Sequence, residues 1–154
     1  MSSPRTRDLQ RTPLIALVHR ANKALQTDMV VSAHRAGHTG IKQAHNAVFA
    51  TLHATPQRAT DMAAAMGITR QSMGEIVREM VDLGILDMVP DPNDGRAKLV
   101  GYSEEGLRIA VDGFDHIRAL EERFVEELGA EDYDTARRVL RRVTEMLDAD
   151  AAKG

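Results

Sequence analysis

The chain has 154 residues, of which 28% are charged and only 3% aromatic, and it contains no cysteine. A chain of this length forms one domain with an ordinary core, and its composition favours helices over a β-sandwich. The lack of cysteine excludes disulfides, thiolate metal sites and a redox-sensing thiol. No apolar run reaches the roughly 20 residues of a membrane span, and the N-terminus lacks a signal-peptide core. We therefore expect a cytoplasmic protein with no membrane contact.

The net charge of −3 is unevenly distributed. Residues 1–43 carry seven Arg and Lys against two Asp, residues 44–100 carry five against seven acidic residues, and residues 101–154 carry eight against fourteen. The basic excess is therefore N-terminal, and the middle of the chain is not suited to simple electrostatic binding of nucleic acid.

Four helices are expected in the first half of the chain. Residues 1–8 lack a core pattern and predict a loose arm, whereas apolar residues at helical spacing predict a helix over 14–35 and another from Ile41 that ends before Pro56. Thr60 can cap a short helix closed by Gly67, and Thr69 can cap a longer helix ended by Gly84. The methionines at helical spacing in these last two helices are assigned to the core: Met62, Met66, Met73 and Met80. A short helix, a tight turn and a longer helix form a helix-turn-helix pattern.

The periodicity changes after Gly84. Residues 85–89 and 97–102 are typical of strands, and residues 90–95 are rich in turn formers, so the pattern predicts a β-hairpin. A hairpin directly after a helix-turn-helix is a wing. Ser103 can cap a long helix that ends at Gly129, and a last helix is expected over 132–147.

The predicted fold is mainly α with a small β-wing, in one domain spanning residues 1–154. A winged helix-turn-helix lobe over 41–103 is flanked by helices over 8–36 and 104–149. Long terminal helices have little to pack against within one chain, so we expect them to form the interface of a two-fold symmetric homodimer.

Two stretches carry a resemblance to a known family. Residues 67–84 are similar to the recognition helix of the MarR family, and residues 90–106 resemble its wing, with Asp94-x-Arg96 at the tip and Ser-Glu-Glu-Gly ending at Gly106. The resemblance implies a dimeric transcriptional regulator of double-stranded DNA, more often a repressor than an activator. It also implies recognition helices in successive major grooves, wings in the flanking minor grooves, and release from the operator by a small ligand.

The chain departs from the family pattern at a few positions. The wing has Met88, Val89 and Gly95 where arginine is usual, and the recognition helix has Glu75 where a basic or small polar residue is common. Each change removes or opposes a phosphate contact, which flattens the salt dependence of binding by roughly one unit.

One face of the predicted recognition helix is polar, and its residues are Thr69, Arg70, Gln71, Ser72, Glu75 and Arg78. Gln71 can bond adenine bidentately, and Arg70 can take guanine or a phosphate. Thr69 and Ser72 suit phosphate contacts, and Glu75 can accept from cytosine. The simpler interpretation is the solvated face of an amphipathic helix, but the wing favours DNA contact.

Arg96 is the strongest single candidate, because an arginine at a hairpin tip suits a narrow minor groove. Asp94 could support its guanidinium through a charge-assisted pair, and Lys98 on the same strand could contact phosphate. The alternative is a solvated turn with an incidental ion pair.

An effector cleft is expected between the DNA-binding lobe and the dimerisation helices. In the family such clefts often take aromatic acids, and the nearby residues form a mostly apolar lining for a small aromatic or apolar ligand. These residues are His45, Val48, Phe49 and Phe114. Ordinary core packing explains the last three equally well.

Two further functions remain open alongside DNA binding. The acidic balance of residues 44–100 would suit a winged-helix module that binds protein, and His34, His38 and His45 could make a zinc-responsive regulator. We expect no cofactor, and solvated histidines explain the pattern more simply than a metal site. No phosphate loop, nucleophile elbow or motif-placed carboxylate pair occurs, so an enzyme is not expected.

Overall fold

The computed structural model describes residues 11–153. The chain divides into two compact units, Met1–Gly113 and Phe114–Gly154. The predicted N-terminal arm, residues 1–8, and the first residues of the predicted dimerisation region, 8–10, lie outside the described residues. Over the described part, no helix has both the length and the apolar character needed to cross a membrane.

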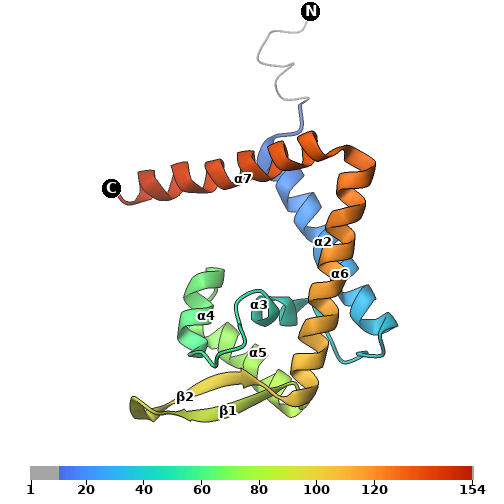
Figure 1. The fold of residues 1–154 in the computed structure, drawn as a ribbon. Coiled ribbons are helices and arrows are strands. Elements are labelled where there is room, and N and C mark those ends of the chain that lie inside the picture. Colours follow the sequence, from blue (N-terminus) through green and yellow to red (C-terminus); the bar gives the residue numbers. More distant parts are fainter. Residues whose placement is uncertain (1–10, 154) are drawn as a thin grey trace, which may run out of the picture. The chain divides into compact units, whose positions relative to one another are not determined.

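The described part is mainly helical, with one two-stranded antiparallel sheet (Figure 1). Its elements are α2 (Leu14–Arg35), η1 (Gln43–His45), α3 (Asn46–Phe49), α4 (Ala59–Met66), α5 (Arg70–Asp82), β1 (Leu86–Asp91), β2 (Asp94–Tyr102), α6 (Glu104–Leu128) and α7 (Ala130–Ala151). The helix-turn-helix is α4 and α5, and the wing is β1 and β2. The predicted mainly α fold with a winged helix-turn-helix is therefore confirmed.

The predicted helix from Ile41 to Pro56 is wrong in its extent. A 3-10 turn, η1, leads into the single-turn helix α3, and an irregular segment follows up to residue 58. The His45 ring explains the start, because its Nδ1 accepts from the backbone N–H of Lys42 at 3.1 Å and closes the 3-10 turn. The backbone carbonyl of Leu52 accepts from the Tyr102 hydroxyl at 3.2 Å, which ties the segment after α3 to the wing.

The helix caps were predicted with mixed success. Thr69 caps α5 as expected, since its Oγ1 accepts from the backbone N–H of Ser72 at 3.0 Å. Thr60 does not cap α4, which begins one residue earlier, at Ala59, and has Arg58 at its N-cap. Ser103 precedes α6 and accepts from the N–H of Gly106 at 3.0 Å, as expected of a cap.

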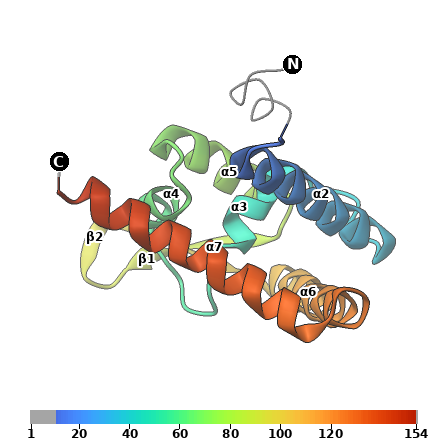
Figure 2. The same ribbon diagram turned by 90° about the horizontal axis from the view of Figure 1, so that it is seen from above.

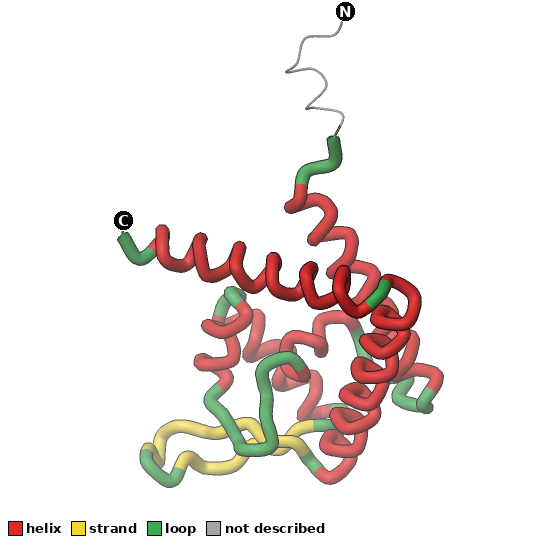
Figure 3. Tube along the Cα trace, turned by 45° about the horizontal axis from the view of Figure 1, so that its top comes forward, coloured by secondary structure: helices red, strands yellow, loops and turns green. Residues whose placement is uncertain are grey.

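The wing is longer than predicted and gains a third backbone segment. β1 and β2 pair from Leu86 with Tyr102 down to Asp91 with Asp94, so the turn is shorter than the predicted 90–95. The segment before α4 joins the sheet edge, because Gln57 and Val100 exchange two backbone hydrogen bonds of 2.9 and 2.7 Å. Figure 3 shows this loop beside the hairpin. The root of the wing is therefore held on both sides of β2.

The core of the first unit lies where α3, α4 and α5 meet the root of the wing, and Figure 2 shows these helices from above. Its buried apolar side chains are Ile41, Val48, Leu52, Met62, Ala63, Met73, Val77, Met80, Ile85, Leu86, Val100 and Ile109. Three of the four methionines assigned to the core are buried, but Met66, at the end of α4, is exposed and that assignment is wrong.

The start of α6 lies very close to the end of the helix-turn-helix. The carbonyl oxygen of Ile85 accepts from the backbone N–H of Ser103 at 3.0 Å and from its hydroxyl at 3.1 Å. Gly106 faces the same carbonyl, and a Cβ at this position would lie 1.8 Å from that oxygen. Only glycine fits here, for steric reasons.

The second unit contains the later part of α6 and all of α7, a helix longer than the predicted 132–147. Gly129 separates the two helices with a φ of 88°, a conformation that favours glycine. Phe124 and Tyr133 pack at 6.4 Å between ring centroids. Most other large apolar side chains on these helices are exposed, including Phe114, Ile117, Leu128, Leu140 and Leu147.

Candidate nucleic-acid interface

The polar face predicted on the recognition helix exists in the structure. Met73, Val77 and Met80 of α5 are buried, which turns the opposite face outward. All six predicted contact residues on this helix and at its N-cap are exposed: Thr69, Arg70, Gln71, Ser72, Glu75 and Arg78. The fold therefore gathers them on one accessible surface.

Hydrogen bonds order part of this surface. Gln71 Nε2 donates to Glu75 Oε1 at 3.1 Å, so the carboxylate orients the amide that was predicted to read adenine. The Thr69 hydroxyl donates to Ser72 Oγ at 2.8 Å. Arg78 lies along the helix, and its Nη1 would be 3.4 Å from a Cβ on Gly74. The guanidinium of Arg78 therefore lies beside Gly74, one helical turn earlier on α5.

Arg96 and Lys98 are exposed on β2, but one predicted contact of the wing is wrong. Asp94 Oδ1 accepts from the backbone N–H of Arg96 at 3.1 Å and does not pair with its guanidinium. The other oxygen, Asp94 Oδ2, lies 3.7 Å from Arg58 Nη2. A short Asx turn explains the geometry, because it directs the carboxylate onto the backbone two residues later.

An ion pair between the buried Asp91 and the partly exposed Arg58, which the sequence pattern did not reveal, lies at the far end of β1. Arg58 donates to Asp91 Oδ2 from Nε at 3.0 Å and from Nη2 at 2.6 Å. The Asp91 side chain is 6% exposed, and its Oδ1 accepts from the backbone N–H of Asn93 at 2.9 Å. The two charged residues are 33 positions apart, so no local spacing could have linked them.

Acid should remove the contribution of Asp91 to stability. The hydrogen bond from the Asn93 backbone and the bonds from Arg58 hold the pKa of this carboxyl below its ordinary value, against the opposing effect of burial. A lowered folded-state pKa stabilises the fold above the unfolded value of about 3.9, and this stabilisation is lost as pH falls through the folded value.

We therefore expect wild type to have a higher thermal midpoint than Asp91→Asn at neutral pH, and this difference should close as the pH falls through the lowered pKa of Asp91. Melting curves followed by circular dichroism across this range measure the gap. A gap of constant size at every pH would contradict the assignment of the stabilisation to the ionised carboxylate.

The charge pattern of the first unit is more favourable to DNA than the residue counts suggest. Asp91 is paired with Arg58, and Glu79 is paired with Lys42 and lies 3.4 Å from His45 Nε2. Four cations on or beside the polar face take part in no ion pair within residues 11–153: Arg70, Arg78, Arg96 and Lys98. Two acidic groups of this unit, Glu79 and Asp91, are thus paired with cations other than these four.

The three histidines proposed for zinc do not form one group. His34 Nε2 lies 2.7 Å from the carbonyl of Ile41, and His38 Nε2 lies 3.0 Å from Asp112 Oδ2. His45 is fully buried, and its Nε2 lies 3.4 Å from Glu79 Oε2. Within the described chain, no three His, Asp or Glu residues are arranged to hold one metal ion.

The residues predicted for an effector cleft fall into different environments. His45 and Val48 are fully buried, and Phe49 stacks on Tyr102 at 6.1 Å between centroids. Phe114 is 66% exposed and begins the second unit. The first two are core residues of the first unit, and the cleft itself remains a prediction.

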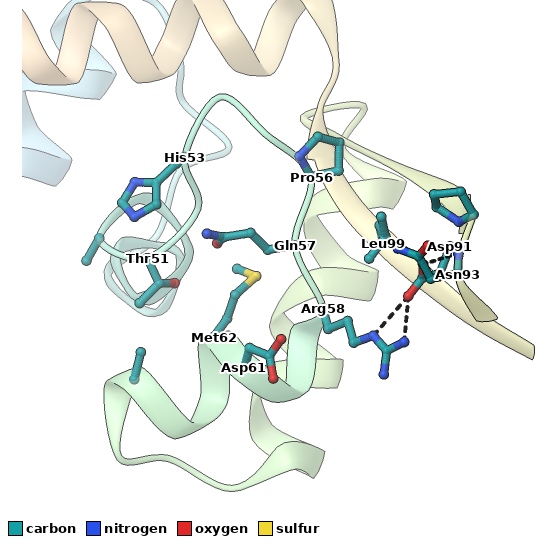
Figure 4. A pocket seen from close by; sticks show the side chains of 13 residues that line it. Thr51, His53, Pro56, Gln57, Arg58, Asp61, Met62, Asp91, Asn93 and Leu99 are labelled. Atoms are coloured by element: carbon teal, nitrogen blue, oxygen red, sulfur yellow. Dashed lines mark hydrogen bonds and ion pairs between the residues drawn. The ribbon is translucent and has the colours of Figure 1, made fainter.

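A separate cavity of about 590 Å³ lies between the segment before α4, the helix α4 and the turn of the wing. Figure 4 shows Thr51, His53 and Gln57 on one side and the Arg58–Asp91 pair on the other. The ion pair forms part of its wall, and no sequence motif indicated this hollow.

Comparison with known proteins agrees with this geometry. Residues 39–97 match the model of the MarR family. The winged core of this chain is therefore similar to that of the MarR family. The match covers η1, α3, the helix-turn-helix and most of the wing. No curated protein matches the chain.

Solved structures of transcriptional regulators share the fold over most of their length. The repressor CouR bound to a 23-mer DNA duplex has a TM-score of 0.71 and 20% identity, covering 86% of this chain and 92% of that chain. MarR from E. coli has a TM-score of 0.69 and 19% identity, covering 86% and 98%. PcaV from Streptomyces coelicolor, in complex with its natural ligand, has a TM-score of 0.63 and 25% identity, covering 87% and 93%.

Proposed function

We propose that this chain is a MarR-family, sequence-specific regulator of transcription that binds double-stranded DNA as a homodimer. In this proposal α5 enters the major groove and the wing, with Arg96 at its tip, enters the adjoining minor groove. The protein would act in the cytoplasm, where its operators are.

The observation that carries the proposal is the exposed polar face of α5 together with the exposed cations of the wing. Arg70 and Arg78 on α5 and Arg96 and Lys98 on β2 make no ion pair inside the described chain, so they are available for phosphates and base edges. Such groups would otherwise be solvated side chains, but a wing beside a recognition helix is a DNA-docking arrangement. The DNA-bound structure of CouR gives a relative of the same fold on a duplex.

The homodimer is supported by apolar side chains that a single chain leaves exposed. They include Leu14, Leu17, Val18 and Leu25 on α2, and Leu140, Met146 and Leu147 on α7. Exposed apolar surface of this extent marks an interaction site, and a two-fold dimer would present two recognition helices to half-sites about one DNA turn apart.

Regulation by a small ligand completes the proposal. The solved relatives include CouR bound to p-coumaroyl-CoA and PcaV bound to its natural ligand. A ligand that favours a different spacing of the two recognition helices would weaken operator binding, and DNA would weaken ligand binding equally. The protein would then be a repressor released by its effector.

Selection from a pool of random duplexes at two salt concentrations tests the function. We expect enrichment of a palindromic site and a steep loss of affinity at the higher salt, because phosphate contacts release counterions. A dimer in solution that selects no sequence would contradict the proposal and would favour a winged-helix module that binds protein.

A further inference from the structure

The wing is attached to the rest of the first unit at two places along its length. Near its root, Gln57 and Val100 exchange backbone hydrogen bonds. At its outer end, Arg58 donates two hydrogen bonds to Asp91, the last residue of β1. The register of the strands shifts between Pro90 and Asp91, so regular pairing does not by itself fix the turn.

The outer attachment leads directly to the tip. Asp91 Oδ1 accepts from the backbone of Asn93 at 2.9 Å, and Asp94 Oδ2 lies 3.7 Å from Arg58 Nη2. The second oxygen of Asp94 accepts from the backbone N–H of Arg96. One guanidinium is therefore connected, through two carboxylates, to the backbone on both sides of the turn.

The pair is held firmly because Asp91 is buried. A carboxylate at 6% exposure is unfavourable without a partner, and Arg58 is the cation that contacts it. Arg58 itself is fixed at the N-cap of α4, with extended backbone. The position of the turn is thus set by the start of the helix-turn-helix, the same element that supports α5.

We infer that Arg58 is a positioning residue for DNA binding, which holds the wing turn through Asp91 and Asp94 and so directs Arg96 toward the groove. The inference rests on the proposed function, since it concerns how the wing reaches DNA. Arg58 is 43% exposed, so the competing interpretation is that its guanidinium contacts a phosphate directly.

The variant Asp91→Asn separates the two interpretations because they predict opposite signs. If Arg58 positions the wing, loss of the carboxylate frees the turn, and affinity for the selected duplex should fall by about tenfold. If Arg58 is a phosphate contact, the same variant releases a cation and removes a negative charge, so affinity should rise. Equal or tighter binding by Asp91→Asn would overturn the inference.

A double-mutant cycle of Arg58→Ala and Arg96→Ala measures the coupling between the two side chains in DNA affinity. A general loss of stability would not produce this coupling. Arg96→Ala should cost much less affinity in the Arg58→Ala background than in wild type, because an undirected Arg96 has already lost its contact. Arg58→Lys, which keeps the charge, should restore part of the loss. Additive effects of Arg58→Ala and Arg96→Ala would overturn the inference.

Two controls keep the outcomes distinct. Arg108→Ala removes an arginine from the exposed pair with Glu105 in α6 and should leave both the affinity and the cycle unchanged. Failure of wild type to select any duplex would count against the proposed function. A different result would count against the positioning role alone: wild type binds the duplex, Arg96→Ala weakens this binding, and Asp91→Asn has no effect on it.

Discussion

Gly106→Ala is expected to lower the free energy of unfolding by at least about 3 kcal/mol, a large effect for a single methyl group. The added Cβ would lie 1.8 Å from the carbonyl oxygen of Ile85 and 2.8 Å from its carbonyl carbon. These are backbone atoms, and the oxygen also accepts two hydrogen bonds from Ser103, so it cannot move aside as a flexible side chain would. Chemical denaturation followed by circular dichroism measures the loss.

Gly113→Ala is the matched control for this substitution. It lies in the same helix, and its added Cβ would meet Met29 Cε at 3.6 Å, an ordinary van der Waals contact. Alanine favours a helix over glycine by up to about 1 kcal/mol, so this variant should be as stable as wild type or more stable. If the two variants have the same stability, the close approach of α6 to Ile85 is contradicted.

Arg96→Ala should weaken binding to the selected duplex by about tenfold to a hundredfold, and it should make the salt dependence shallower by about one unit. Its guanidinium is exposed at the outer part of β2 and pairs with no carboxylate in the described chain. Its loss would therefore remove the proposed contact to DNA and no ion pair within the described residues. Titrations at several salt concentrations measure both quantities. The thermal midpoint should not change.

Arg96→Lys controls for the charge of this side chain. A lysine keeps the cation but not the planar guanidinium, so the salt slope should stay near that of wild type while part of the affinity is lost. An unchanged affinity for Arg96→Ala would place the wing outside the DNA interface and would leave α5 as the main reader.

The order of the elements was predictable because helical and strand periodicities differ strongly along this chain. Thr69, Ser103 and the glycine stops marked real helix ends. The helix predicted from Ile41 was wrong in its extent because contacts that the local residue pattern does not show determine the structure there. The His45 ring closes a 3-10 turn, and the Leu52 carbonyl bonds to Tyr102, a residue 50 positions away.

The site was predictable to a similar degree. Amphipathic spacing placed the polar face of α5 correctly, because burial of Met73 and Val77 leaves only one orientation of that helix. The predicted pairing of Asp94 with the Arg96 guanidinium was wrong, because an Asx turn competes with that ion pair and the folded turn takes the backbone hydrogen bond instead. The pairing of Arg58 with Asp91 depends on how α4 meets the wing, which a single sequence does not show.

The junction between the wing and α6 has a mechanical consequence. Only Ser103 separates β2 from α6, and it bonds to the carbonyls of Gly84 and Ile85. Gly106 also lies against the carbonyl of Ile85, so the first turn of α6 has little room to change its angle to β2. A rotation of the first turns of α6 must therefore rotate the root of the wing and the end of α5 together, as one rigid body.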